Sequence, residues 1–396
     1  MSEPAHRRRR SFGPALCAVW VLLLTSSPLR AEDTFHNPYQ TRGDYASLLV
    51  IDAVTGTVLL QKDPDKVRAP ASLTKMMTLY LLLDANRRGE VSLSDTLDVP
   101  WQSSKIGGSG VGLRSHEKMT LKEAGEAMII SSGNDAAIAI AEHLAGTEPI
   151  FANRMTKKAR EIGMLSTRYI NAHGLDGWSL TSLTTAHDLS VLARRLLQFP
   201  QTTQWCSRRT LTIRGGQEIH TTNRLLGHFE GMDGIKTGFT GPAGFCFVGT
   251  AERDSLRLIS VVLGASTNEA RFRESGWALT EAFHRYRRVT AARRGHPVGL
   301  DLRIEGAIPP AIPILPAEDV PLVLPRTSSQ PIRFQLTPRP LALPLSVGQP
   351  VGRLDVMVGD SLVARIDALA GAPARRESWW QRFIKALGLH KPSRTG

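Results

Sequence analysis

A serine and a lysine near residue 70 have the types and spacing needed for nucleophilic catalysis. Ser72 and Lys75 are separated by two residues, so a helix places their side chains on one face. Backbone N–H groups at a helix start stabilise developing negative charge, and a desolvated lysine can take a serine proton. A capping serine beside a surface lysine has the same spacing. A second copy of the pattern, Ser115 and Lys118, lies in a polar stretch that we interpret as a solvated loop.

Two further segments carry polar groups that suit a substrate cleft. Ser132 and Asn134 flank a glycine between an apolar run and an alanine-rich stretch. There they can direct a hydroxyl and an amide into a cleft, or can form an ordinary helix-capping turn. Lys236, Thr237 and Gly238 lie in a predicted strand, where the glycine permits close backbone approach and the lysine suits an anionic peptide. A charged residue on a solvated strand is the alternative interpretation.

The order of the three segments is more specific than any one of them. Ser-x-x-Lys, Ser-x-Asn and Lys-Thr-Gly begin at positions 72, 132 and 236, which is the order found in β-lactamases and penicillin-binding proteins. The other Ser-x-Asn copy, at 266–268, completes no such set. Four blocks extend the likeness: Pro70–Thr78, Ser132–Ala136, Asn171–Asp176 and Asp233–Thr240. At these residues the chain resembles a low-molecular-mass penicillin-binding protein, specifically an exported serine-type D-alanyl-D-alanine carboxypeptidase.

The resemblance implies a role for each motif residue. Ser72 would attack the penultimate D-Ala carbonyl of a peptidoglycan stem peptide, with Lys75 as general base, and water would hydrolyse the acyl-enzyme after the terminal D-Ala leaves. Ser132 would relay a proton to the leaving amine. Asn134 would hold the substrate amide, and Lys236 would attract the terminal carboxylate. No metal or cofactor is implied.

The remaining expected substrate contacts also follow from the resemblance. Backbone N–H groups of Ser72 and Phe239 would form the oxyanion hole, beside Thr237 and Gly238 on the same strand. Arg271 matches an arginine that helps to bind the carboxylate, although it also fits the surface of an amphipathic helix. Some relatives carry histidine in place of Phe239, which leaves side-chain tuning of deacylation open.

Other activities remain as alternatives to carboxypeptidase action. β-Lactams mimic the D-Ala-D-Ala terminus and should acylate Ser72. A β-lactamase of class A would need a Glu-x-x-Leu-Asn-type acid, and the sequence from 135 to 235 has none. An endopeptidase that cleaves peptidoglycan cross-links would use the same residues. An inactive wall-binding module would have lost a motif member, whereas all three are present.

Hydrophobic patterns predict the elements that position these residues. Residues 45–53 and 57–61 form a predicted hairpin, a buried helix runs over 70–84, and Thr120 to Glu123 form a capping box. Further elements are expected at 136–145 and 186–197 (helices), 244–251 and 256–263 (strands) and 271–287 (helix). We therefore expect one α/β domain over 33–290. The resemblance adds a mixed sheet flanked by a helical subdomain, with the site at their junction.

The composition changes after residue 297. Twelve prolines within 297–350 forbid long helices, and short β-type runs predict a small all-β domain over 297–370. Residues 374–390 then predict an amphipathic helix. Its aromatic and aliphatic residues suit an anionic membrane surface, as in many family members, and docking on the protein body is the alternative.

The N-terminus and the charge distribution point to export rather than to nucleic acid. Residues 1–31 combine four consecutive arginines with a ten-residue apolar run, which predicts a cleaved signal peptide; an uncleaved anchor is the alternative. Of the net charge of +13, residues 1–31 carry +4 and residues 371–396 carry +5. We thus expect a periplasmic protein attached peripherally to the inner membrane. Cys206 and Cys246 could pair after export or remain free.

Overall fold

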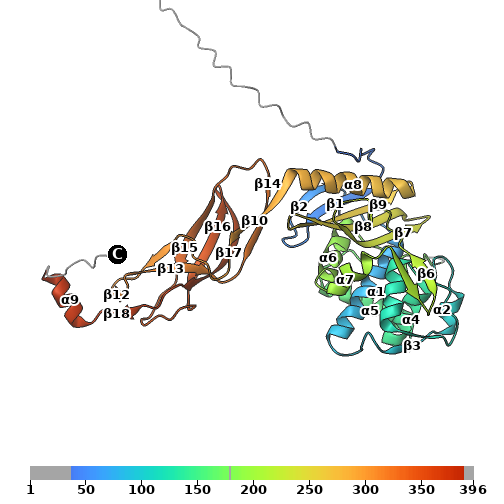
Figure 1. Cartoon of the computed structure of the whole chain (residues 1–396), viewed down its shortest axis with the longest axis horizontal. Helices are drawn as coiled ribbons and strands as arrows, with labels where there is room; N and C mark the ends of the chain where they lie inside the picture. Colours follow the sequence, from blue (N-terminus) through green and yellow to red (C-terminus); the bar gives the residue numbers. More distant parts are fainter. Residues whose placement is uncertain (1–36, 178–179, 388–396) are drawn as a thin grey trace, which may run out of the picture. The chain divides into compact units, whose positions relative to one another are not determined.

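The catalytic-type motifs lie in a domain built around one five-stranded sheet. The computed structural model describes residues 37–177 and 180–387, so the predicted signal peptide lies outside the described residues. The strands are β1 (Ser47–Asp52), β2 (Val58–Lys62), β7 (Met232–Thr240), β8 (Gly244–Arg253) and β9 (Leu256–Ala265) (Figure 1). Their order is β2-β1-β9-β8-β7, which places β7 at an edge.

Every strand pair in this sheet is antiparallel. The prediction of a mixed sheet, with both parallel and antiparallel pairs, is therefore wrong. The physical reason is connectivity. Short turns join β1 to β2, β7 to β8 and β8 to β9, and such turns force antiparallel pairing. The long helical segment between β2 and β7 carries the chain to the opposite edge instead of forming a parallel crossover.

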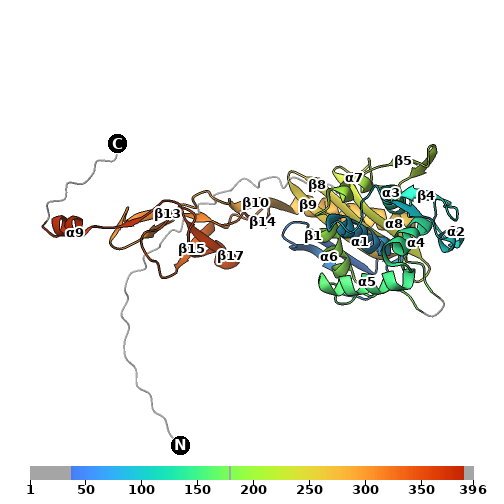
Figure 2. The same ribbon diagram turned by 90° about the horizontal axis from the view of Figure 1, so that it is seen from below.

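Helices cover both faces of the sheet. The layer between β2 and β7 comprises α1 (Lys75–Arg87), α2 (Trp101–Lys105), α3 (Leu121–Ile130), α4 (Asn134–Ala145), α5 (Glu148–Glu161), α6 (Ala186–Leu196) and α7 (Pro200–Cys206). The other face is covered by α8 (Asn268–Arg285), as Figure 1 shows; Figure 2 views the domain from the side of the helical layer. Alternate residues of β1 point to opposite faces. Leu49 and Ile51 join the core with the helical layer, whereas Leu48 and Val50 join the core with α8.

The helix predicted over 70–84 and the helix start predicted at Thr120 are both present in the structure. The 70–84 segment begins with the 3-10 turn η1 (Ala71–Thr74) and continues as α1, whose residues are buried on nearly every face. Thr120 caps α3 by accepting a hydrogen bond from the Glu123 N–H at 3.1 Å. The Glu123 carboxylate, however, accepts from the Arg214 N–H at 2.7 Å, so the capping box is half formed. The helix expected over 271–287 is α8, which ends at Arg285 because β10 (Tyr286–Ala292) begins at the next residue.

Short strand pairs and a second sheet complete the architecture. Within the helical segment, β3 (Thr96–Asp98) pairs with β4 (Lys118–Thr120), and β5 (Thr210–Ile213) with β6 (Gln217–His220). The C-terminal β region contains β10, β11 (Asp301–Arg303), β12 (Ala307–Ile308), β13 (Ala311–Pro316), β14 (Val320–Pro325), β15 (Ile332–Pro338), β16 (Pro350–Val358), β17 (Ser361–Ala370) and β18 (Arg375–Arg376). This region has its own hydrophobic core. It is followed by α9 (Trp379–Ala386).

Candidate active site

Ser72 and Lys75 meet at the junction between η1 and α1. Lys75 is the first residue of α1 and is fully buried, whereas Ser72 is half-buried. The Lys75 Nζ lies 2.9 Å from the Ser72 Oγ. The second copy of the pattern has a different local structure, because Ser115 lies in a turn and Lys118 begins β4. Only the first pair therefore has the helical geometry that its spacing allows.

The Lys75 amine has two further partners, both of them carbonyl-type oxygens. Its Nζ donates to the Asn134 Oδ1 at 2.6 Å and to the His173 backbone oxygen at 2.8 Å. Burial lowers the pKa of Lys75 well below its usual value, and the nearby charge of Lys236 lowers it further, while Asp135 opposes the shift. The structure thus favours a neutral amine that is held by three contacts.

The Ser132 to Asn134 segment joins α3 to α4. Ser132 is buried and adopts a φ of 68°, in the left-handed region that is unusual for residues other than glycine. Asn134 begins α4, and its side chain connects Lys75 to a glycine-rich loop, because its Nδ2 donates to the Gly107 oxygen at 2.7 Å. The backbone N–H of Asn134 donates to the Ser109 oxygen at 2.8 Å. The strained backbone at Ser132 therefore lies two residues before Asn134, which organises the site.

Strand β7 brings the third motif against η1. A Cβ on Gly238 would lie 3.0 Å from the Pro70 oxygen and 3.1 Å from the Ser72 nitrogen, so any other residue would be tightly packed against η1, whereas glycine allows this approach without displacement. The Thr237 hydroxyl lies 2.6 Å from the hydroxyl of Thr222. Three motifs that are far apart in the sequence thus converge on one junction.

Lys236 adds a second buried amine to this junction. Its Nζ donates to the Thr237 oxygen at 3.1 Å. Burial lowers its pKa to about 7, and the charge of Arg271 lowers it in the same direction. The two lysines are close enough for the charge of Lys236 to lower the pKa of Lys75. Such paired shifts are typical of catalytic sites.

Phe239 and Arg271 occupy opposite environments beside Gly238. The Phe239 ring is 53% exposed and stacks on Phe245 with centroids 4.2 Å apart. Arg271 is buried, and its Nη1 donates to the Gly238 oxygen at 2.9 Å and to the Cys246 oxygen at 3.3 Å. Its guanidinium therefore contacts the backbone of two strands. The alternative of a surface position on the helix is therefore wrong, whereas binding of the substrate carboxylate by Arg271 stays a prediction.

Two loops that shape the site carry residues to which sequence reasoning gave no role. His173 supplies a backbone oxygen to Lys75, and a Cβ on Gly174 would lie 1.9 Å from the Ala71 oxygen, so this loop presses against η1. In the glycine-rich loop 106–113, the N–H groups of Val111 and Leu113 donate to the Asp135 carboxylate at 2.9 and 3.0 Å. The family-like block 171–176 and the glycines of 106–113 were the features in the sequence that could have indicated these loops. The contacts themselves are made by backbone atoms, which every residue has, so no residue type identifies them.

The remaining sequence candidates are the second Ser-x-Asn copy and the two cysteines. Thr267 caps α8 and Ser266 binds Asp44, so the 266–268 copy is a helix start. Cys206 and Cys246 are both free and buried. Burial raises the pKa of the Cys206 thiol to about 12 and that of the Cys246 thiol to about 11.

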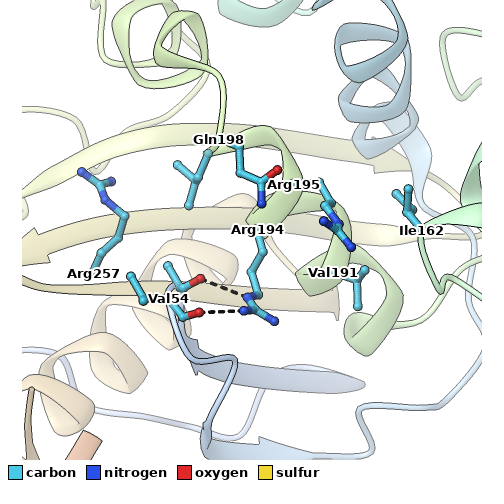
Figure 3. A pocket seen from close by; sticks show the side chains of 9 residues that line it. Val54, Ile162, Val191, Arg194, Arg195, Gln198 and Arg257 are labelled. Atoms are coloured by element: carbon cyan, nitrogen blue, oxygen red, sulfur yellow. Dashed lines mark hydrogen bonds between the residues drawn. The ribbon is translucent and has the colours of Figure 1, made fainter. Parts of the chain in front are cut away.

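A cavity of about 670 Å³ lies away from the motif residues (Figure 3). It is lined by Ala53, Val54, Ile162, Val191, Arg194, Arg195, Leu197, Gln198 and Arg257. Arg194 donates to the backbone oxygens of Ala53 and Val54 at 3.0 and 2.7 Å, and Arg257 pairs with Asp233 at 2.7 Å. Two of the three arginines thus hold local structure, and the cavity does not contain the catalytic-type groups.

Comparison with known proteins agrees with this architecture. Residues 35–267 match the family described as D-alanyl-D-alanine carboxypeptidase. DacF of Bacillus subtilis (strain 168), a D-alanyl-D-alanine carboxypeptidase, is 33% identical over 285 residues, covering 71% of this chain and 73% of that protein. The structure of the D-alanyl-D-alanine carboxypeptidase DacD from Francisella tularensis has 27% identity and a TM-score of 0.68, with 87% of this chain and 96% of that chain covered. Ampicillin-bound penicillin-binding protein D2 from Listeria monocytogenes has 33% identity and a TM-score of 0.57, covering 61% and 98% respectively.

The fold and these matches define a serine peptidase of the penicillin-binding class. The chain belongs to the peptidase S11 family and is a serine-type D-alanyl-D-alanine carboxypeptidase. The family resemblance of the motifs is thereby confirmed, as is the expected fold class apart from the direction of the strands.

Proposed function

We propose that this carboxypeptidase removes the terminal D-alanine from peptidoglycan stem pentapeptides through an acyl-enzyme at Ser72. The observation that carries the proposal is the set of three contacts around the Lys75 amine. A neutral amine has two N–H groups and one lone pair. The oxygens of Asn134 and His173 can only accept, so they take the two N–H groups, and the lone pair is left to accept the Ser72 proton. Lys75 is thus arranged as a general base.

The other motif residues then act on the bound peptide. Ser72 attacks the penultimate D-Ala carbonyl, and the N–H groups of Ser72 and Phe239 stabilise the oxyanion. Ser132 relays a proton to the leaving D-alanine, and Asn134 holds the substrate amide. Water later hydrolyses the ester and restores the serine.

The terminal carboxylate of the peptide is assigned to the buried central part of β7. Lys236 and the Thr237 hydroxyl supply the charge and the donor there, and Gly238 allows the strand to lie close to Ser72. The charge of Arg271 extends this positive region, since it lowers the pKa of Lys236.

β-Lactams resemble the D-Ala-D-Ala terminus, so they provide the test of this proposal. A fluorescent penicillin incubated with the purified protein should form one stable adduct, and digestion should map it to Ser72. A D-Ala-D-Ala peptide should compete for labelling and release D-alanine. Absence of labelling, or an adduct at Ser115, would overturn the assignment. Assaying a cross-linked muropeptide in parallel separates carboxypeptidase from endopeptidase action, and the rate of adduct decay measures any β-lactamase activity.

The pKa of Lys236 predicts the pH dependence of substrate binding. The pKa is lowered to about 7, so in the enzyme without substrate the Lys236 amine is charged below that pH and neutral above it. We expect the KM of a D-Ala-D-Ala peptide to rise above about pH 7, by up to about tenfold per pH unit. The same peptide with an amidated C-terminus lacks the carboxylate and should not show this rise. Measuring KM for both peptides across the range tests the assignment, and parallel curves would contradict it.

We further propose that the protein is exported and held on the inner membrane surface. The support is the N-terminal composition of residues 1–31 and the exposed apolar side chains on and after α9. These side chains, which are between 41% and 64% exposed, are Trp379, Trp380, Phe383, Ile384 and Leu387. Such a cluster is typical of an interaction surface. The domain limits expected from the sequence are 33–290, 297–370 and 374–390. We propose that the peptidase domain ends with α8 and that the β domain extends from β10 to β18, because β10 pairs with β14 and β18 pairs with β12; the membrane-binding helix is then α9. Among the described residues, no helix is long and apolar enough to cross a bilayer.

Deleting residues 374–396 tests the role of this helix. Because the deletion removes the apolar cluster and its neighbouring basic residues, we expect the protein to move from the membrane fraction to the soluble fraction. Fractionation of cells followed by penicillin labelling measures this change. Leu165→Ala removes an apolar side chain that is 81% exposed and does not belong to this cluster, so this control should stay on the membrane. Retention of the truncated protein would count against the proposal.

A further inference from the structure

We propose that Arg271 is a positioning residue for the oxyanion hole, holding the peptide group that joins Gly238 to Phe239. This inference rests on the proposed function, in which the Phe239 N–H binds the oxyanion. The carbonyl of the same peptide group is the Gly238 oxygen, which accepts a hydrogen bond from the Arg271 Nη1 at 2.9 Å. Arg271 would thus act through the backbone rather than by touching the substrate.

The geometry of one peptide group links the two contacts. The Gly238–Phe239 bond is trans, so its C=O and N–H point in opposite directions in one plane. Fixing the carbonyl therefore fixes the direction of the N–H. Gly238 pairs with Cys246 on β8, and the Arg271 Nη1 also lies 3.3 Å from the Cys246 oxygen. The guanidinium bridges the two strands on the side of the sheet that is covered by α8.

The other oxyanion donor lies directly beside this peptide group. A Cβ on Gly238 would lie 3.1 Å from the Ser72 nitrogen and 3.2 Å from the Leu73 nitrogen. A small rotation of the peptide group would therefore change the separation of the two proposed donors. An oxyanion hole requires such donors to be fixed before the reaction.

The surroundings of Arg271 hold its guanidinium in place. The carbon at its centre lies 4.8 Å from the Phe272 ring and 5.4 Å from the Phe245 ring. Its Nη2 donates to the Asn268 side chain. Burial lowers the pKa of Arg271 to about 10, so the group is still charged at neutral pH. A charged donor makes a stronger hydrogen bond and polarises the peptide group, which strengthens its N–H as a donor.

Direct binding of the substrate carboxylate is the competing role. Within the described residues, Nη1 donates to two backbone oxygens and Nη2 donates once to Asn268, whereas Nε has no partner. Arg271 is 7% exposed. These contacts favour action through the Gly238 oxygen, and the two roles predict different results when the substrate carboxylate is removed.

The test compares Arg271→Gln and Arg271→Lys with the wild type and with Arg224→Gln. Arg224 is an exposed arginine that pairs with Glu269 of α8, the helix that also carries Arg271. The charge of Arg224 lowers the pKa of Arg271, so the Arg224 variant controls for long-range charge. Each protein is first labelled with penicillin to count active sites and then melted to check its fold. Arg271→Lys keeps the buried charge but not the planar two-oxygen bridge, and it remains informative if the glutamine variant does not fold.

Two readouts then separate positioning from carboxylate binding. The first is kcat/KM for a D-Ala-D-Ala peptide and for an acyl-D-alanine thioester that lacks the terminal carboxylate. The second is the infrared stretch of the ester carbonyl in the penicillin acyl-enzyme, which falls when the oxyanion hole binds it well. We expect both Arg271 variants to lose about tenfold with both substrates, which is less than the roughly 10²–10³-fold cost of deleting a donor. We also expect the stretch to move to higher wavenumber.

The inference is overturned if only the carboxylate-bearing peptide is affected, if the carbonyl stretch does not move, or if Arg224→Gln reproduces the effects. Failure of the wild type to acylate at Ser72 is a different result. It would remove the proposed function itself, before any Arg271 variant is considered.

Discussion

Replacing Ser72 with alanine should abolish both D-alanine release and penicillin labelling. Loss of a serine nucleophile removes the covalent route altogether, and comparable serine hydrolases then lose roughly 10⁴-fold or more in kcat. Because Ser72 is half-buried at the turn η1, alanine should fit without disturbing the fold. The measurements are steady-state D-alanine release, labelling by fluorescent penicillin and the melting temperature.

Ser115→Ala is the matched control, since it alters the other Ser-x-x-Lys copy. Ser115 lies in a turn before β4, so its variant should retain wild-type labelling and turnover. Labelling that survives in Ser72→Ala and disappears in Ser115→Ala would reverse the assignment. An unchanged melting temperature in Ser72→Ala is needed to attribute the loss to chemistry.

The elements around Ser72 could be predicted because their sequence signals are local and strong. The helix that carries Lys75 is apolar on nearly every face, and the structure buries it accordingly. Thr120 caps its helix through the expected contact. The order of the three motifs along the chain also indicated that they meet in one site. These predictions depended on residue types at fixed spacings, which is the information that a sequence carries directly.

The contacts that tune the site could not be predicted in this way. The Lys75 amine binds the backbone oxygen of His173, and Arg271 binds the backbone oxygen of Gly238. Every residue has a backbone oxygen, so no residue type identifies the one that will accept. The strand direction was also missed, since it depends on how the chain connects distant strands. For Arg271, the sequence indicated neither the buried position nor the contact with the Gly238 oxygen.

Replacing Lys75 with methionine should slow acylation by about 10³-fold, within the range of general base catalysis. Methionine has a similar length and tolerates burial, but it has neither the lone pair that accepts the Ser72 proton nor the N–H groups. The oxygens of Asn134 and His173 would lose their donor, so stability should also fall, by about 1–3 kcal/mol for each oxygen left unsatisfied. Stopped-flow measurement of penicillin acylation, together with thermal melting, gives both quantities.

The pH profile separates loss of the base from loss of structure. The pKa of Lys75 is lowered well below its usual value by burial and by Lys236, so the amine is neutral at higher pH and is protonated as the pH falls. Wild-type acylation should therefore fall in acid with the titration of Lys75, and the residual rate of Lys75→Met should lack this step. Lys118→Met, in the other Ser-x-x-Lys copy, alters an exposed lysine and should leave both rate and profile unchanged. An acid limb that persists unchanged in Lys75→Met would contradict the assignment of Lys75 as its source, because methionine has no titratable group.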